Sequence, residues 1–259
     1  MSRIANATAV ERALLILEYL DSSRRGLNIS EIGRKLEIPK SSAHVIVVTL
    51  ERLGYLERKP DSLNYHLGLK AYGLGRGMIK DLSLGELALP VMRVLVDRLH
   101  VPAHLAVADG EQGVYVQKVD APGLIKFDTY VGRRMDLHCT GVGKVMLAYG
   151  AAEVVQSRLT KQVYIRHTSN TITSPRSLRR ELARVRELGY AVDDEEEELG
   201  VRCVAVPVFH PGGHFAAALS VTGTTEQIPL EALESVAQQL KRSAAAIFPP
   251  VPATTARRS

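Results

Sequence analysis

A proline break between two short helical segments, followed by a predicted hairpin, constrains this chain more than any other feature. It lies in the stretch from Asn28 to Arg58, NISEIGRKLEIPKSSAHVIVVTLERLGYLER. Asn28 and Glu31 have the N-x-x-E spacing with which two side chains satisfy the free N–H groups of a first helical turn. Pro39 disfavours helical geometry in the residue before it and suits the first turn of the next helix. The pattern predicts two helices, the second from about Lys40 to Leu53.

The second of these helices divides into a buried side and an exposed side. Apolar residues at helical spacing make the predicted buried stripe, which consists of Ala43, Ile46 or Val47, Leu50 and Leu53. The other side collects a cation, hydroxyls, a histidine and small apolar groups: Lys40, Ser41, Ser42, His44, Val45, Val48 and Thr49. Lysine binds phosphate, hydroxyls reach phosphates or base edges, and a small apolar group contacts a thymine methyl. These residue types favour a helix that reads the major groove of DNA.

The segments YLERK and NYHLG flank Pro60–Leu63, and they predict a hairpin with Arg58 and Lys59 near its tip. An ordinary small α+β core with a solvated basic surface is the alternative, and the placement of charge favours the DNA-binding interpretation over it. Residues 1–80 hold 13 Lys+Arg and 8 Asp+Glu, whereas residues 81–259 hold 20 of each. The formal excess of +5 therefore lies with the helix pair, as attraction to backbone phosphates requires.

This N-terminal pattern resembles the winged helix-turn-helix of the IclR family of bacterial transcriptional regulators. The resemblance rests on VERAL (10–14), the following ILEYL, and the stretch ISEIGRKLEIPKSSAHVIVVTLERLGYLER. The family commonly carries an arginine directly after the histidine of the recognition helix, and this chain has Val45 there. That departure moves readout toward apolar contact. The resemblance implies DNA contacts from Lys40, Ser41, Ser42, His44, Thr49 and Arg58.

Length and composition bound the rest of the chain. Its 259 residues suffice for two domains, and 46% of them are hydrophobic. No uninterrupted apolar run approaches the roughly 20 residues that a membrane span needs, and the N-terminus lacks a cleavage-site pattern. We therefore expect a cytoplasmic protein with no membrane partner. Two cysteines, Cys139 and Cys203, are too few for a disulfide framework and are expected to be reduced.

The predicted elements follow from changes in hydrophobic period. We expect a first helix at Thr8–Leu20, whose buried side consists of Ala9, Ala13, Leu14, Leu17 and Leu20. We expect a second helix at Leu84–Leu99, whose buried side consists of Leu84, Leu87, Ala88, Val91, Leu95 and Leu99. Between them, 69–82 is expected to be a linker helix weakened by three glycines, which indicate either interdomain flexibility or a helix held by partner contacts. Segments 104–109, 113–120 and 125–131 predict an antiparallel meander. Helices from Ser174 to Gly189 and from Pro229 to Phe248 flank three further strands.

Two segments form a candidate sensor site. In CTGVGK (139–144), small residues allow close approach to a ligand, and the N–H groups that open the next helix favour an anion such as a carboxylate. A mere tight turn is the alternative. In the second segment six acidic residues follow Val192. We expect Asp193 to face inward as a hydroxyl acceptor and Glu195–Glu198 to form a solvated loop.

These two segments also resemble the IclR family, whose effector domain is a GAF-like sheet-and-helix fold. LHCTGVGK matches its loop, and Gly189, Asp193, Glu196 and Cys203–Ala205 match its C-terminal signature, although His210 stands where Asp or Asn is usual. The resemblance implies an effector site in which Gly141, Val142 and Gly143 offer backbone donors to a carboxylate. It further implies a polar end formed by Asp193, Cys203 and Ser220 and an apolar wall at Val201. A free cysteine at 203 is alternatively a small core residue.

The sequence therefore predicts an α+β protein in which an N-terminal winged helix-turn-helix (5–68) is joined by a linker helix (69–82) to a GAF-like α/β effector-binding domain (83–250), before a disordered tail (251–259). We expect a repressor or activator that binds double-stranded operator DNA as a homodimer or dimer of dimers (a tetramer) and responds to a small carboxylate effector. The alternatives are a DNA-independent carboxylate sensor and a cysteine-dependent hydrolase. We expect no enzyme activity, cofactor or metal, because His138 and Cys139 are adjacent and His104, His138, His210 and His214 show no metal-ligand spacing.

Overall fold

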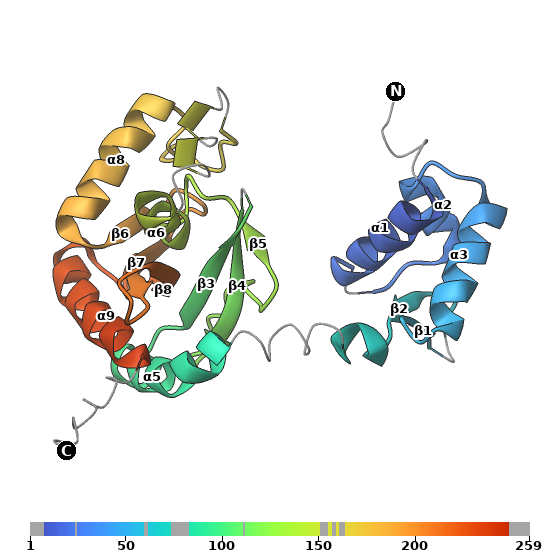
Figure 1. The fold of residues 1–259 in the computed structure, drawn as a ribbon, viewed down its shortest axis with the longest axis horizontal. Helices are drawn as coiled ribbons and strands as arrows, with labels where there is room; N and C mark the ends of the chain where they lie inside the picture. The colour runs from blue at the N-terminus through green and yellow to red at the C-terminus, as the bar shows by residue number, and fades with distance from the viewer. Residues whose placement is uncertain are drawn as a thin grey trace, which may run out of the picture. The chain divides into compact units, whose positions relative to one another are not determined.

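The computed structural model describes residues 8–23, 25–59, 62–73, 83–110, 112–150, 155–156, 159–160 and 164–248. The chain divides into two compact units, Met1–Asp81 and Leu82–Ser259 (Figure 1). Residues 69–73 are helical, as predicted for the start of the linker helix. The remainder of that predicted helix, 74–82, and the predicted tail, 251–259, lie outside the described residues.

The first unit is a winged helix-turn-helix. Its elements are α1 (Ala9–Asp21), α2 (Ile29–Lys35), α3 (Lys40–Arg52), β1 (Leu56–Arg58) and β2 (Tyr65–Leu67), and the two strands pair antiparallel. Its core consists of Ile16, Leu20, Leu27, Ile32, Leu36, Ala43, Val47, Leu50, Leu56 and Tyr65. The predicted helix pair and hairpin are confirmed.

Local capping defines the helix starts in this unit. The side chain of Asn28 accepts from the backbone N–H of Glu31 at 3.0 Å, and the Glu31 carboxylate accepts from the backbone N–H of Asn28 at 3.0 Å. Thr8 and Glu11 make the same reciprocal pair at the start of α1. Both pairs satisfy N–H groups that have no partner within the helix, so α1 and α2 begin where the sequence places their caps.

The predicted buried face of α1 is wrong in part. Leu14 is 57% exposed and Ala9 is exposed, whereas Ile16, which was not predicted to be buried, has no exposed surface. Leu53 of the predicted α3 stripe is likewise 42% exposed. The buried face of α1 is set by where α3 and β2 pack against it, and the helical period alone does not give that direction.

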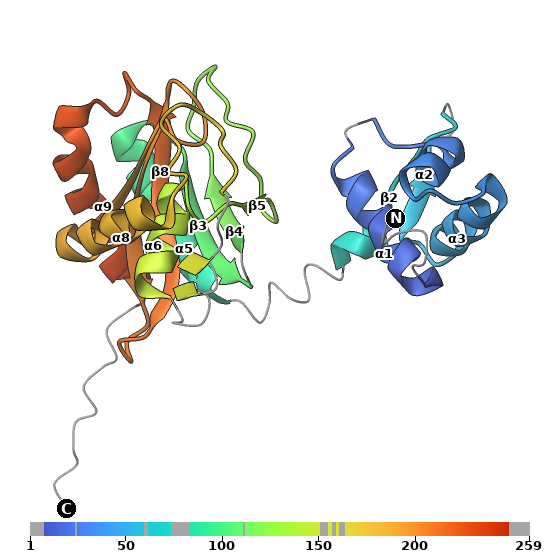
Figure 2. The ribbon, with the colours of Figure 1, turned by 90° about the horizontal axis from the view of Figure 1, so that it is seen from above.

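The second unit is built on a six-stranded antiparallel sheet. Its strands are β3 (Ala103–Asp109), β4 (Gln112–Val119), β5 (Arg134–Met135), β6 (Ala191–Asp194), β7 (Val201–Phe209) and β8 (Phe215–Thr224), in the order β5-β4-β3-β8-β7-β6. Figure 2 shows the run β8, β3, β4 and β5 from left to right. Antiparallel pairing runs from β6 through β7 and β8 to β3, with one register shift in β7 between Val208 and Phe209, so residues far apart in the sequence lie side by side in the sheet.

Helices cover both faces of this sheet (Figure 1). On one face, α5 (Ser83–Leu99) and α9 (Leu233–Ile247), which follows the 3-10 turn Leu230–Ala232, pack on a core that includes Leu105, Val204 and Leu219. On the other face lie α6 (Gly141–Tyr149) and α8 (Pro175–Leu188), whose core includes Ala106, Ala205 and Ala218. The small residues on this second face let α6 pack closely on the strands.

Among the predictions for the second unit, those for residues 125–131 and for Leu87 are wrong. Residues 125–131 form no strand, and the third strand of the meander is β5 instead. In this segment the Thr129 carbonyl accepts from the Lys118 ammonium at 2.7 Å, and the backbone N–H of Thr129 donates to the Phe127 carbonyl at 2.8 Å, so its backbone bonds locally and to a side chain instead of joining a strand. In α5, Leu87 is 38% exposed and Met92 is fully buried in its place.

Among the described residues, we find no helix with the length and apolar character that a bilayer span requires.

A buried ion pair joins α6 to the turn after β6. Lys144 is 1% exposed, and its ammonium group bonds to the Glu196 carboxylate and, at 2.7 Å, to the carbonyl oxygen of Val192. Glu196 is 6% exposed, so the predicted solvated loop is wrong at this residue. A lysine within an otherwise apolar helix is the sequence signal for this pair, because a buried ammonium group requires a partner.

We expect Lys144→Met to lower the free energy of unfolding by about 3 kcal/mol, because it leaves the Glu196 carboxylate buried without its cation. The double variant Lys144→Met/Glu196→Leu removes both charges and should be more stable than the single variant. Urea denaturation of the full chain measures both changes. Equal stability of wild type and Lys144→Met would show that the pair contributes nothing to folding.

Candidate functional site

The N-terminal half of α3 presents the predicted DNA-contacting residues at the surface. Lys40, Ser41 and His44 are exposed, and Ser42 is partly exposed. Helix α3 begins directly after Pro39, which supplies no side-chain cap, so the N–H groups of its first turn point outward without a capping side chain. Arg58 is exposed at the end of β1, where its Nε donates to the Ser62 carbonyl at 3.2 Å. Cation, hydroxyls and free N–H groups therefore occupy one end of a single helix.

Thr49 lies elsewhere, in an apolar groove of about 470 Å³ between α1 and α3. Its hydroxyl donates to the Val45 carbonyl at 2.7 Å. The exposed side chains of the groove include Val10 at 69%, Leu14 at 57% and Val45 at 65%. Three large apolar side chains with this exposure in one groove make a surface that water solvates poorly.

In the second unit, an acidic cavity of about 370 Å³ holds the predicted residues Asp193, Val201 and Cys203. Its lining comes from β4, β6, β7 and β8, from the turn after β6, from the segment 127–133 and from His167. Its complete lining is Tyr115, Phe127, Asp128, Thr129, Arg133, His167, Asp193, Glu197, Glu198, Val201, Cys203 and Thr222. Ser220 is not among these residues; Thr222, two residues along the same strand, takes its place and lies 3.1 Å from the Cys203 sulfur.

The glycines of α6 serve packing in this structure. A Cβ on Gly141 would lie 3.3 Å from the Ala205 Cβ, and one on Gly143 would lie 2.5 Å from the Leu137 Cα. The N–H of Gly143 already donates to the Thr140 hydroxyl, the N-cap of α6, at 3.1 Å. Gly141, Val142 and Gly143 are buried and do not line the cavity. The absence of side chains at 141 and 143 brings α6 against β7 and the preceding turn.

Asp193 organises the turn that forms one wall of the cavity. It is 2% exposed, and its Oδ1 accepts from the backbone N–H groups of Glu196 at 2.8 Å and Glu197 at 3.4 Å. Burial raises the pKa of Asp193 to about 7, although these hydrogen bonds and Lys144 oppose the rise. The predicted inward direction of Asp193 agrees with this burial, and its carboxylate is a hydrogen-bond acceptor at the cavity wall.

Arg133 is the arginine of the cavity lining, which also holds four carboxylates: Asp128, Asp193, Glu197 and Glu198. Its guanidinium lies 3.5 Å from the Glu197 carboxylate, and both side chains are about one-third exposed. Burial raises the pKa of Glu197, and Arg133 opposes that rise. An isolated sequence cannot assign Arg133 to this site, because it lies in a turn that only the fold brings beside β6 and β7.

Cys139 is buried, whereas Cys203 is partly exposed and lines the acidic cavity. Burial raises the pKa of both Cys139 and Cys203, so neither is the thiolate that nucleophilic catalysis needs. This environment argues against the thiol hydrolase alternative.

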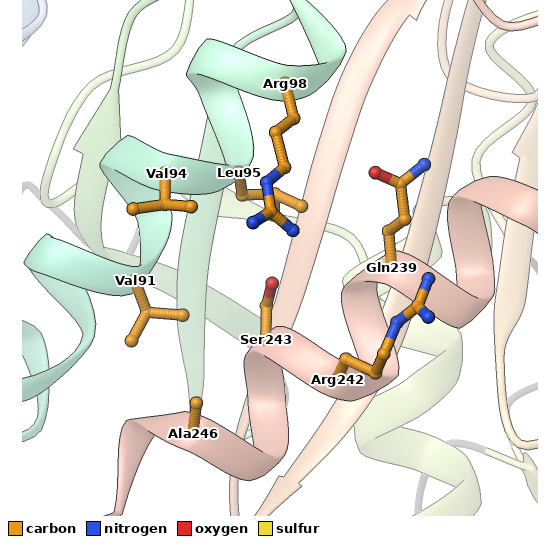
Figure 3. A pocket seen from close by; sticks show the side chains of 8 residues that line it. All are labelled: Val91, Val94, Leu95, Arg98, Gln239, Arg242, Ser243 and Ala246. Carbon is orange, nitrogen blue, oxygen red and sulfur yellow. The ribbon is translucent and has the colours of Figure 1, made fainter.

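A further groove of about 290 Å³ lies between α5 and α9 (Figure 3). Val91, Val94 and Leu95 form its apolar side on α5, and the side chain of Arg98 reaches into the space between the two helices (Figure 3). It shares no residue with the acidic cavity, because α5 and α9 cover the opposite face of the sheet. No predicted site residue lines it.

We expect Asp193→Asn to reduce the pH dependence of stability. The folded pKa of Asp193 lies above its ordinary value of 3.8, so the folded state binds more protons between pH 4 and 7 and stability falls as pH rises through that window. A single group contributes at most about 1.4 kcal/mol per pH unit. Urea denaturation at several pH values should show a shallower decline in the variant than in wild type, and an unchanged slope would contradict the assignment.

Comparisons with known proteins agree with both units. Residues 9–60 match the IclR helix-turn-helix domain, and residues 77–248 match the bacterial transcriptional regulator IclR C-terminal domain. The HTH-type transcriptional regulator XynR of Escherichia coli is 33% identical over 239 residues, which cover 92% of this chain and 95% of XynR.

Solved structures give the same result. The Thermotoga maritima IclR structure has 32% identity and a TM-score of 0.75, with 92% of this chain and 96% of that chain covered. An IclR homolog from Microbacterium hydrocarbonoxydans, complexed with 4-hydroxybenzoate, has 28% identity and a TM-score of 0.82, with 93% and 97% covered. The C-terminal match alone spans more than half of the sequence. The chain therefore belongs to the IclR family of DNA-binding bacterial transcriptional regulators.

Proposed function

We propose that the chain binds double-stranded operator DNA through the N-terminal half of α3 and the β1–β2 wing. The single observation that carries this proposal is the exposure of Lys40, Ser41 and His44 on a helix that starts without a side-chain cap. Lys40 and the free N–H groups suit phosphates, and Ser42 and His44 suit base edges. Arg58 of the wing suits an adjacent phosphate. Operator binding in a bacterium places the protein in the cytoplasm.

The regulator acts as a homodimer or dimer of dimers in this proposal. One recognition helix covers only a few base pairs, so paired half-sites are needed for useful discrimination against other DNA. The apolar groove that includes Val10, Leu14 and Val45 supports this, because a second copy removes such a surface from water. Thr49, which lines the groove, then belongs to the dimer contact rather than to the DNA contact.

We expect substitutions in α3 to affect DNA binding in two ways, by lowering the affinity for all duplexes or by changing the sequence preference. Lys40→Ala should weaken binding to all duplexes about equally and lower the slope of log affinity against log salt by about 1. Ser42→Ala and His44→Ala should change the order of preference among duplexes, at a cost of about 1–3 kcal/mol for the preferred one. Fluorescence anisotropy at several salt concentrations measures both.

Lys126→Ala is the matched control, since Lys126 lies in the second unit and donates to the Ala121 carbonyl. If all three α3 variants kept the affinity and salt dependence of the control, α3 would not be the DNA-reading helix.

The second half of the proposal places a small carboxylate effector in the acidic cavity. Arg133 is positioned to exchange its Glu197 partner for the effector carboxylate, and Asp193 to accept a hydroxyl of the effector. Cys203 and Thr222 form the floor, and Val201 the apolar wall. Gly141, Val142 and Gly143 affect the cavity only indirectly, because Gly141 packs against Cys203. Ser220 lies two residues before Thr222 on β8. The 4-hydroxybenzoate complex of the Microbacterium homolog supports a carboxylate as the class of ligand.

We expect Arg133→Gln to abolish the stabilisation that a carboxylate effector gives. A thermal-shift screen of about a hundred metabolic carboxylates identifies the ligand through its stabilisation of the folded state. The neutral amide of each stabilising acid serves as a chemical control. Arg134→Gln is the matched variant, because Arg134 is adjacent in sequence and pairs outside the cavity with Asp109 at 2.5 Å.

Loss of the shift in Arg134→Gln but not in Arg133→Gln would contradict the carboxylate site. A DNA-independent sensor remains the competing function. It predicts the same thermal shifts without any salt-sensitive DNA affinity, and anisotropy on the same preparation separates the two.

A further inference from the structure

The groove between α5 and α9 carries positive charge that its own lining does not balance. Arg98 reaches into it from α5, and Arg242 lines it from α9 (Figure 3). Among the described residues that line this groove, none is acidic. The acidic cavity, with which it shares no residue, has the reverse composition of four carboxylates and one arginine. Of these two hollows, the groove is therefore the one whose charge attracts an anion.

The polar side chains of the groove are available to a ligand. Within the part of the chain that the structure describes, the guanidinium groups of Arg98 and Arg242 make no hydrogen bond or ion pair. The same holds for the Gln239 amide and the Ser243 hydroxyl, which line the groove from α9. A guanidinium presents its N–H donors in a planar fork that fits a carboxylate, and an amide or a hydroxyl adds a further donor.

Apolar side chains form the rest of the groove. Val94 is 50% exposed, Val91 is partly exposed, and Leu95 is buried beneath them. Ala246 adds a small exposed side chain from α9. Both helices pack on the same core of the sheet, so the walls are fixed before a ligand arrives. A mostly apolar groove with a few converging polar groups is typical of small-ligand sites, and about 290 Å³ lies close to the lower end of their range.

We propose that this groove binds a small amphipathic monocarboxylate. Its carboxylate accepts charge-assisted hydrogen bonds from Arg98 and Arg242, and its aliphatic end removes Val91 and Val94 from water. An inorganic anion would leave the apolar half of the groove exposed to solvent. A neutral alcohol or amide would leave both cations without a counter-charge. A molecule with one charged and one apolar end matches both halves, and binding it does not depend on the effector site proposed above.

The test is a calorimetric titration of the full chain with octanoate below its micelle concentration. We expect saturable, equimolar binding. Hexanoate should bind more weakly, by at most about fourfold for each methylene group that it lacks, because less apolar surface is buried. Octanamide keeps the aliphatic chain but loses the charge, so it should bind more weakly than octanoate by about tenfold or more.

Matched variants locate the octanoate on the molecule. Arg98→Gln should weaken binding by about tenfold or more, whereas Arg93→Gln should leave it unchanged, because Arg93 is exposed on the same helix but does not line the groove. Ala246→Phe should fill the groove and abolish binding. Ala245→Phe is its control, since Ala245 is the neighbouring exposed alanine of α9 and lines a different pocket. Both alanines are exposed, so neither ring has to enter the core.

Absence of saturable octanoate binding would overturn the proposal. Binding that is lost in Arg133→Gln but kept in Arg98→Gln would also overturn it, because octanoate would then occupy the acidic cavity. Sedimentation velocity of the ligand-free variants tests another occupant. A change of oligomeric state in Ala246→Phe but not in Ala245→Phe would make the groove a contact between copies of the chain, and the proposal would fail. Octanoate binding that persists in Arg133→Gln supports this site even if no carboxylate binds the acidic cavity.

Discussion

The buried contact between Lys144 and Glu196 is the interaction on which the site in the C-terminal unit depends. It connects α6 to the turn after β6, and the same ammonium group holds the Val192 carbonyl. The turn can then place Asp193 inward, where it accepts the N–H groups of Glu196 and Glu197. Without a buried cation, this concentration of carboxylates against the sheet would be strongly unfavourable. The acidic wall of the cavity is therefore a consequence of one lysine in an apolar helix.

The two units place their charge in different ways. The N-terminal unit carries the positive excess of the chain, and its cations Lys40 on α3 and Arg58 on the wing are exposed to solvent, where a charge has little desolvation cost. The C-terminal unit encloses its charge, so burial raises the pKa of Asp193, Glu196 and Glu197. Exposed charge suits a salt-dependent contact with phosphates. Enclosed charge suits discrimination among small ligands, because interactions are stronger where water is excluded.

Sequence patterns predicted what local geometry determines. The Asn28–Glu31 cap, the break at Pro39 and the left-handed Gly189 that ends α8 involve residues within a few positions of one another, and all three are confirmed. The antiparallel hairpin β3–β4 follows in the same way from its Asp109-Gly110 turn.

Predictions were less successful where distant segments meet. Whether Ile16 or Leu14 is buried depends on the packing of α3 and β2 against α1. The assignment of Arg133 and Thr222 to the cavity depends on strand order, which no local pattern contains. The glycines at 141 and 143 were expected to allow close approach to a ligand, whereas the groups that lie against them in the structure belong to the chain's own sheet and turn. Residue types therefore indicated the chemistry of the site, whereas the fold determined which residues contribute to it.

The most direct measurement is the coupling between operator and effector, taken in both directions. Effector affinity is measured by calorimetry with and without a saturating operator duplex, and operator affinity with and without saturating effector. If one chain joins a DNA-reading unit to a ligand-reading unit, each ligand must change the affinity for the other by the same factor, about 5- to 150-fold for typical coupling. Effector affinity that stays the same whether or not the operator is bound would contradict this.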